Sequence, residues 1–306
     1  MSRIAYFGPQ GTFTEQAALR LIDPSTDELV PMETVPAALT AVRKGEADAA
    51  CVPVENSVEG AVTITMDALA EGEPLVAVAE TVLQVAFSIL VRPGTAAPDV
   101  ATVASIPIAL AQVRGWLAEH LPDAEHRFTN STSASAVAVL NGEFDAAVTA
   151  PVAVTHYPLE ELATGVADVA DAKTRFLLLR QPGPLPAPTG ADRTSVIAFT
   201  DDRTGVLAEL LIELANRGIN LTRIESRPTK GRLGEYRFFL DFDGHVAEAR
   251  VGDALAALRR RCRSVRFLGS YPKADGLPSL VQPGTEDETF DLASDWLRAV
   301  RAGRAG

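Results

Sequence analysis

The sequence has little of what disulfide frameworks, metal sites and membrane spans require. Its two cysteines, Cys51 and Cys262, lie far apart, and its four histidines follow no metal-ligand spacing. No apolar run reaches the roughly 18 residues of a membrane helix, and the first residues lack the basic and apolar regions of a signal peptide. We therefore expect a cytoplasmic protein with neither a disulfide framework nor a metal site.

Positive charge is also scarce, because 28 Lys and Arg residues oppose 40 Asp and Glu residues, for a formal net charge of −12. Nucleic acids and anionic membranes attract clustered Lys and Arg, so the composition argues against both as partners. The sequence contains no P-loop, no dinucleotide-binding glycine motif and no nucleophile elbow. Hydrophobic residues make up 47% of the chain, which is ordinary for a globular protein.

Segments of different composition divide the chain. Residues 182–192 are rich in Pro and Gly and are predicted to link a first domain, 1–181, to a second domain, 193–271. Residues 272–306 form a polar tail with one predicted helix, whose shared apolar face holds Phe290, Leu292, Trp296 and Leu297.

The first domain alternates helix-like segments with apolar strands, which are predicted at 3–7, 48–54, 75–79, 84–91, 145–149 and 174–180. It also contains a repeat: Lys44–Cys51 (KGEADAAC) and Asn141–Val148 (NGEFDAAV) each lie where a helix ends and a strand follows. Two such units predict an α/β domain of two lobes with a ligand cleft between them. The first lobe comprises about 1–80 and 170–181, and the second comprises about 81–169.

The second domain has a different order of elements. Strands are predicted at 194–199, 219–225, 236–242 and 265–269, and helices at 203–217 and 246–261, with a turn at 229–235. A βαββαβ order within fewer than ~80 residues predicts a ferredoxin-like sandwich.

Three segments of the first domain place small polar residues directly before a predicted helix. They are GPQGTFTE, in which Thr12 and Glu15 have capping-box spacing, PVENSVEG after the strand ending near Val54, and NSTS at Asn130–Ser133. Helix N-termini carry free N–H groups and the positive end of the helix dipole, so they bind carboxylates without many basic side chains. Plain helix capping explains Thr12 and the NSTS segment equally well.

Four segments, in order, closely resemble the prephenate dehydratase family: IAYFGPQGTFTEQAA, VPVENSVEG, the ST of NSTS, and TRFLLL. The resemblance implies a catalytic domain like the bilobal periplasmic binding proteins, with the active site between its lobes. Two departures stand out. Ser105-Ile106-Pro107-Ile108 replaces the family's frequent Ser-His-Pro-Gln, and Ala172 replaces a frequent Asn, so any role of that His, Gln or Asn is absent or filled differently here.

The resemblance also implies an activity, the decarboxylative dehydration of prephenate to phenylpyruvate in phenylalanine biosynthesis, with no cofactor. The family's essential threonine corresponds to Thr174, with Arg175 and Phe176 in the same catalytic motif. We hypothesise that Thr174 donates a hydrogen bond to the departing hydroxyl, helped by Glu55 or Glu59 if either is buried, and that Arg175 clamps a carboxylate or pairs with a Glu. The implied substrate-binding residues are Thr12, Phe13, Glu55, Asn56, Ser57, Glu59, Gly60, Ser131 and Thr132.

Two segments of the second domain, TGVLAELL at Thr204–Leu211 and ESRP at Glu225–Pro228, resemble the phenylalanine-binding motifs of the ACT domain in this family. Val206 stands where that motif has Ala. The resemblance implies that phenylalanine acts as an allosteric inhibitor at Gly205, Val206, Leu207, Ala208, Glu225, Ser226, Arg227 and Pro228. Because ACT domains usually pair across a two-fold axis, a homodimer or homotetramer is expected.

Two alternatives remain open. An arogenate dehydratase performs the same reaction on the amino analogue, and recognition of one amino group needs only one carboxylate. A non-catalytic amino-acid sensor would bind a ligand without turnover and leaves the TRF motif unexplained. Rates of product formation from prephenate and arogenate distinguish these alternatives.

Overall fold

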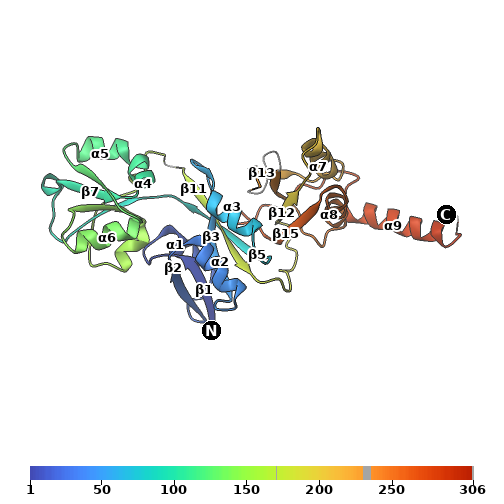
Figure 1. Cartoon of the computed structure of the whole chain (residues 1–306), viewed down its shortest axis with the longest axis horizontal. Coiled ribbons are helices and arrows are strands. Elements are labelled where there is room, and N and C mark those ends of the chain that lie inside the picture. The colour runs from blue at the N-terminus through green and yellow to red at the C-terminus, as the bar shows by residue number, and fades with distance from the viewer. Residues whose placement is uncertain (170, 230–235, 305–306) are drawn as a thin grey trace. The chain divides into compact units, whose positions relative to one another are not determined.

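The structure is a computed structural model that describes residues 1–169, 171–229 and 236–304 (Figure 1). The chain forms two compact units, one of Met1–Ala68 with Thr81–Gln181 and one of Leu69–Glu80 with Pro182–Gly306. Within the described ranges, no helix is both long and apolar enough to cross a membrane. Apart from Thr229, the predicted turn at 229–235 lies outside the described residues.

The first lobe is built on a sheet with the strand order β2-β1-β3-β11-β5, and β4 pairs with β3. Its strands are β1 (Ser2–Phe7), β2 (Asp27–Met32), β3 (Ala49–Asn56), β4 (Gly60–Ala61), β5 (Val76–Gln84) and β11 (Lys173–Arg180). Its helices are α1 (Phe13–Leu21), α2 (Val35–Arg43) and α3 (Thr63–Ala70). Residues 81–84 thus continue β5, where the sequence predicted separate strands at 75–79 and 84–91.

The second lobe is built on a sheet with the strand order β10-β6-β9-β7-β8. Its strands are β6 (Ser88–Val91), β7 (Thr102–Ser105), β8 (Glu125–Phe128), β9 (Ala146–Thr149) and β10 (Glu160–Thr164). Its helices are α4 (Pro107–Gln112), α5 (Arg114–His120) and α6 (Thr132–Leu140), with 3₁₀ turns η1 (Ala97–Asp99) and η2 (Pro151–Thr155). The predicted two-lobed α/β architecture is confirmed.

The two sheets share one plan, as the sequence repeat predicted. The order β2-β1-β3-β11 corresponds to β8-β7-β9-β6, with two parallel pairs followed by one antiparallel pair in each lobe. The repeat glycines end α2 and α6 in the left-handed conformation, at φ +74° for Gly45 and +78° for Gly142. Each glycine N–H donates to a helix carbonyl, of Val42 or Val139, at 3.0 Å.

The aspartate of each repeat binds the first residues of the neighbouring parallel strand. Asp48 accepts the N–H of Arg3 at 2.7 Å, and Asp145 accepts the N–H of Thr102 at 3.0 Å and its hydroxyl at 2.8 Å. Burial raises the pKa of Asp145, but hydrogen bonds from Thr102 and Arg92 outweigh burial and bring this pKa below its ordinary value of 3.8. The repeated x-G-E-x-D-A-A motif therefore has two structural roles: its glycine ends a helix, and its aspartate binds the neighbouring parallel strand.

The C-terminal unit contains an antiparallel sheet with the order β13-β14-β12-β15. Its strands are β12 (Asp192–Phe199), β13 (Leu221–Pro228), β14 (Tyr236–Asp243) and β15 (Ser264–Pro272), and its helices are α7 (Val206–Ala215) and α8 (Ala249–Arg261). Buried side chains of both helices, including Leu210 and Val251, join those of the sheet in one core. This βαββαβ unit confirms the predicted ferredoxin-like fold, and α9 (Asp287–Arg301) confirms the predicted tail helix.

We predict that Asp145→Ala lowers the free energy of unfolding by about 2 kcal/mol, because it leaves the N–H groups of Ala101 and Thr102 without their acceptor. Since folding lowers the pKa of Asp145, its stabilising effect is complete above pH 3.8 and disappears as the pH falls through the folded-state pKa. Urea unfolding at neutral and acidic pH measures both effects. The exposed Asp123→Ala serves as control, and equal losses in the two variants would contradict the assignment.

Candidate active site

The TRF motif and the ENS segment meet across two antiparallel strands. β11 begins with Lys173, Thr174 and Arg175, and β3 ends beside it with Glu55 and Asn56. Arg175 pairs with Glu55 at 3.6 Å, and the Asn56 side chain bonds Thr174 at 2.8 Å across a sequence separation of 118 residues. The two motifs therefore form one continuous ladder of contacts.

Ser57 extends this ladder by one residue. Its N–H donates to the carbonyl of Lys173 at 2.8 Å, and its hydroxyl accepts the N–H of Lys173 at 2.9 Å. The hydroxyl of Ser57 is thus used to hold the start of β11. Gly60 follows with φ +82° in the short strand β4, opposite Asn56, where a side chain would strain the backbone.

The orientation of the Asn56 amide is fixed by its other contacts. Its Oδ1 accepts the backbone N–H groups of Val58 at 2.8 Å and Glu59 at 3.0 Å. Only the amide oxygen can accept these two donors, so the NH₂ group faces Thr174. Asn56 therefore donates to Thr174 Oγ1, and the hydroxyl hydrogen of Thr174 takes no part in that bond. Thr174 is 9% exposed, so its hydroxyl is buried. Its oxygen accepts from Asn56, and its hydrogen remains to be donated.

The two carboxylates near Thr174 do not meet the condition set for a proton donor. The side chain of Glu55 is 40% exposed, and Glu59 is exposed. The burial on which their proposed role depended is therefore absent. The guanidinium of Arg175 is only 8% exposed, and its observed pairing with Glu55 is the second of the two roles considered for it. Phe176 is 1% exposed and belongs to the core.

Two of the three predicted helix starts occur where the sequence placed them. The third prediction is wrong, because PVENSVEG forms the end of β3, a turn and the start of β4, and α3 begins only at Thr63. Thr12 caps α1 by accepting the N–H of Glu15 at 3.3 Å, and Ser131 caps α6 by accepting the N–H of Ala134 at 3.0 Å. Phe13 stacks edge-on against Phe87 of the second lobe with ring centroids 5.3 Å apart. Thr132, the first residue of α6, is 6% exposed. The hydroxyls of Thr12 and Ser131 thus serve as caps.

Sequence analysis did not identify a contact between the lobes at Glu15. This carboxylate is 4% exposed, accepts the N–H of Gly11 at 2.6 Å and lies 3.0 Å from Nε2 of His156. It therefore reaches back one residue further than a capping box would. Burial raises the pKa of the nearby Tyr6 phenol, and the negative charge of Glu15 raises it further. No local pattern marks His156, because the contact depends on how the two lobes meet.

A cavity of about 390 Å³ lies where Gly8 and Pro9 of the first lobe meet Asn130 and Ser131 of the second. This volume is within the range of small-molecule sites, roughly 300–1,000 Å³. Of the predicted substrate-binding residues, Ser131 lines this cavity and the Thr174 ladder does not. The structure thus brings predicted residues together at the β3–β11 ladder, whereas Ser131 is the one predicted residue among those that line the cavity.

The three positions that depart from the family pattern carry apolar side chains. Ile106 packs partly buried against the core of the second lobe, Ile108 is 48% exposed and Ala172 is 2% exposed, so none of them supplies a polar group. Ser105, which fits the pattern, is fully buried and donates to the carbonyl of Val148 at 2.7 Å. Among the residues that the structure describes, no cluster of His, Cys, Asp or Glu has the arrangement of a metal site.

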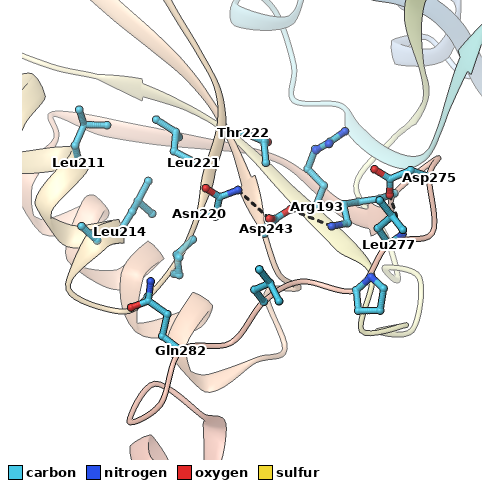
Figure 2. Close-up of a pocket in the computed structure, with 16 residues that line it drawn as sticks. Arg193, Leu211, Leu214, Asn220, Leu221, Thr222, Asp243, Asp275, Leu277 and Gln282 are labelled. Atoms are coloured by element: carbon cyan, nitrogen blue, oxygen red, sulfur yellow. Dashed lines mark hydrogen bonds and ion pairs between the residues drawn. The ribbon is translucent and has the colours of Figure 1, made fainter.

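The two predicted effector segments lie at an end of α7 and on β13. Gly205 precedes α7 with φ +83°, and Val206, Leu207 and Ala208 form its first turn. Glu225, Ser226, Arg227 and Pro228 are the last residues of β13. A cavity of about 840 Å³ in this unit lies elsewhere, and Figure 2 shows Leu211, Leu214, Asp243 and Leu277 among its lining. None of the eight predicted effector residues lines that cavity.

Comparison with known proteins identifies both domains. The prephenate dehydratase family model matches residues 4–184, and the ACT domain model matches residues 194–260. The prephenate dehydratase of Amycolatopsis methanolica is 64% identical over 304 residues, covering 99% of both chains. That of Mycobacterium tuberculosis strain H37Rv is 50% identical over 312 residues, covering 99% of this chain and 95% of the relative.

A solved structure agrees in fold over almost the whole chain. The crystal structure of prephenate dehydratase from Arthrobacter aurescens in complex with L-Phe matches with a TM-score of 0.93 and 44% identity. The match covers 98% of this chain and 99% of the Arthrobacter chain. The chain belongs to the prephenate dehydratase family of carbon–oxygen lyases and carries a C-terminal ACT domain.

Proposed function

We propose that Thr174 is the hydrogen-bond donor to the leaving hydroxyl when this enzyme converts prephenate to phenylpyruvate. The reaction breaks the bond to the ring carboxylate and the bond to the ring hydroxyl, and it consumes one proton while releasing CO₂ and water. Aromatisation of the ring supplies the driving force, so the protein must chiefly assist departure of the hydroxyl. The observation that carries the proposal is the hydrogen bond from Asn56 to Thr174 Oγ1.

The direction of this bond matters for catalysis. Because Thr174 Oγ1 already accepts a hydrogen bond, its own O–H is polarised and free to donate toward the substrate. Asn56 thus acts as a positioning residue. The proton that the reaction consumes comes from solvent, to which the side chains of Glu55 and Glu59 are open.

The pyruvyl carboxylate of prephenate needs a binding group that does not also retain the departing carboxylate. We assign this role to Arg175, while the N-termini of α1 and α6 offer further carboxylate-binding groups. The buried guanidinium is poorly screened by water, and its Glu55 partner is 3.6 Å away, longer than a close hydrogen-bonded ion pair. Displacing Glu55 with a substrate carboxylate is therefore a small change in geometry.

For regulation, we propose that phenylalanine binds the ACT unit at Gly205–Ala208 and Glu225–Pro228 and inhibits the enzyme. The Arthrobacter relative was crystallised with L-Phe, which supports the effector. Because residue 205 is glycine, the start of α7 has no side chain there, and no atom of the described residues lies within 4 Å of the position that a Cβ would take. This opening allows a ligand carboxylate to approach the first N–H groups of α7.

We also propose that the ACT units pair along β13. The sheet has two outer strands, and Arg266 of β15 donates to the carbonyl of Leu69 at 2.8 Å. Residues 69–80 thus lie against β15, and a Cβ on Gly269 would lie 2.3 Å from the carbonyl oxygen of Ala77. β13 pairs with β14 on one side, and its other edge carries the exposed side chain of Ile224. Such an edge favours pairing with a second copy.

Two substitutions test the role of Thr174. Thr174→Ala should lower kcat by ~10²-fold or more, because no donor remains for the leaving hydroxyl. Asn56→Asp keeps an oxygen for the turn at Val58 and Glu59 but removes the NH₂ donor, so the Thr174 hydroxyl turns toward the introduced carboxylate. We expect a loss of kcat of similar size, measured as phenylpyruvate formation. Thr174→Ser is the matched control, and near-normal turnover by Thr174→Ala would refute the assignment.

Alanine substitutions at two glycines test the proposed effector site. Gly205→Ala should raise the phenylalanine concentration for half-inhibition by about tenfold, because a Cβ strains the left-handed backbone by roughly 1–2 kcal/mol and obstructs the helix start. Gly190→Ala is the control, since Gly190 has φ +80° and equally open surroundings but lies outside both motifs. Activity is measured with increasing phenylalanine. Unchanged inhibition of Gly205→Ala would place the effector elsewhere.

A further inference from the structure

The tail helix α9 exposes a large apolar face. None of its 15 residues is buried, and only Phe290 and Ala299 are partly covered. Trp296 is 59% exposed and Leu292 is 63% exposed, although both are large apolar side chains. Figure 1 shows α9 continuing past α8 toward the C-terminus. Such a concentration of exposed apolar groups on one helix marks an interaction surface.

The start of α9 is fixed to the ACT unit. Asp287, the first residue of α9, accepts the N–H of Ala249 at the start of α8, at 2.8 Å. Before it, Lys273 contacts Asp243 at 3.2 Å, and a Cβ on Gly218 would lie only 2.6 Å from the hydroxyl of Thr285. The tail is therefore held at several points, and the helix beyond Asp287 is presented in a defined direction.

The spacing on α9 is that of a short coiled coil. Phe290 and Leu297 lie seven residues apart, as do Ala293 and Val300, with alternating separations of three and four. These are the a and d positions of two heptads. A single helix with this pattern covers its apolar seam by packing against another helix. Two heptads are short for an independent coiled coil, so the association is expected to depend on concentration.

The charges of α9 are segregated along its length. The first nine residues carry four acids and no base, at Asp287, Glu288, Asp291 and Asp295. The last four residues carry two bases, Arg298 and Arg301. Two such helices packed in parallel would place acid beside acid, whereas antiparallel packing places the acidic half of each beside the basic half of the other.

We propose that α9 pairs in antiparallel orientation with α9 of a second copy of this chain. Matching the a and d positions places Phe290 against Val300 of the partner subunit and Ala293 against Leu297 of the partner subunit. The two-fold axis then crosses the helix pair at the level of Asp295, so Ser294 lies about 3 Å along the helix axis from its own counterpart. Asp287 lies within one turn of Arg301 of the partner subunit. The contact is the same on both copies, as a two-fold interface requires. It is separate from pairing of the ACT sheets along β13.

Disulfide trapping in the full-length chain tests this arrangement. The native cysteines give little background, because Cys51 is fully buried and Cys262 is 7% exposed. Ser294→Cys should form an intermolecular disulfide under mild oxidation, because the pairing brings two copies of this position together. Thr289→Cys should cross-link roughly tenfold or more slowly, since antiparallel packing separates its two copies by about 18 Å along the helix axis.

A second substitution tests whether the disulfide cross-link depends on the apolar face of α9. Leu297→Glu added to Ser294→Cys should abolish the cross-link, whereas Leu280→Glu should not, because Leu280 is 89% exposed and lies outside α9. Retained phenylpyruvate formation shows that each variant is folded. Absence of the Ser294→Cys cross-link, persistence of the cross-link with Leu297→Glu, or equal rates for Ser294→Cys and Thr289→Cys would each overturn the proposal.

Discussion

The antiparallel pairing of β3 with β11 is the contact on which the proposed catalytic site depends. The chain leaves the first lobe after β5, builds the second lobe, and returns as β11 to the centre of the first sheet. That return places Thr174 beside Asn56 and Arg175 beside Glu55. Both motifs are unremarkable alone, since each is a strand end with polar residues. The register of the two strands buries the Thr174 hydroxyl, with its hydrogen directed away from Asn56. It also buries the guanidinium of Arg175, 3.6 Å from Glu55.

The same arrangement explains how a chain of net charge −12 accommodates a dianionic substrate. The positive groups are few and local: the poorly solvated Arg175 and the capped N-termini of α1 and α6. Local fields of this kind act at short range, whereas the surface charge of the chain is screened over about 10 Å at ordinary ionic strength. The overall negative charge of the chain therefore does not prevent a carboxylate from binding at these proposed groups.

Sequence patterns predicted the parts of the fold that depend on local chemistry. The repeat glycines, the caps at Thr12 and Ser131, and the βαββαβ order all follow from backbone preferences of a few residues. The strands β2, β8 and β10 were not predicted, because these edge strands carry mostly partly or fully exposed side chains and form through backbone pairing. The short strands β4 and β7 were not predicted either, since two and four residues are too few to show a strand pattern. The Glu15–His156 contact and the exposure of Glu55 depend on tertiary packing, which no local pattern records.

A double-mutant cycle on kcat between Asn56 and Thr174 tests the central claim most directly. If Asn56 acts only by orienting the Thr174 hydroxyl, then Asn56→Asp should cost nothing further once Thr174→Ala has removed that hydroxyl. The account predicts that the double variant turns over prephenate at the rate of Thr174→Ala alone. Losses that multiply in the double variant would show that the two residues act independently and would contradict the account.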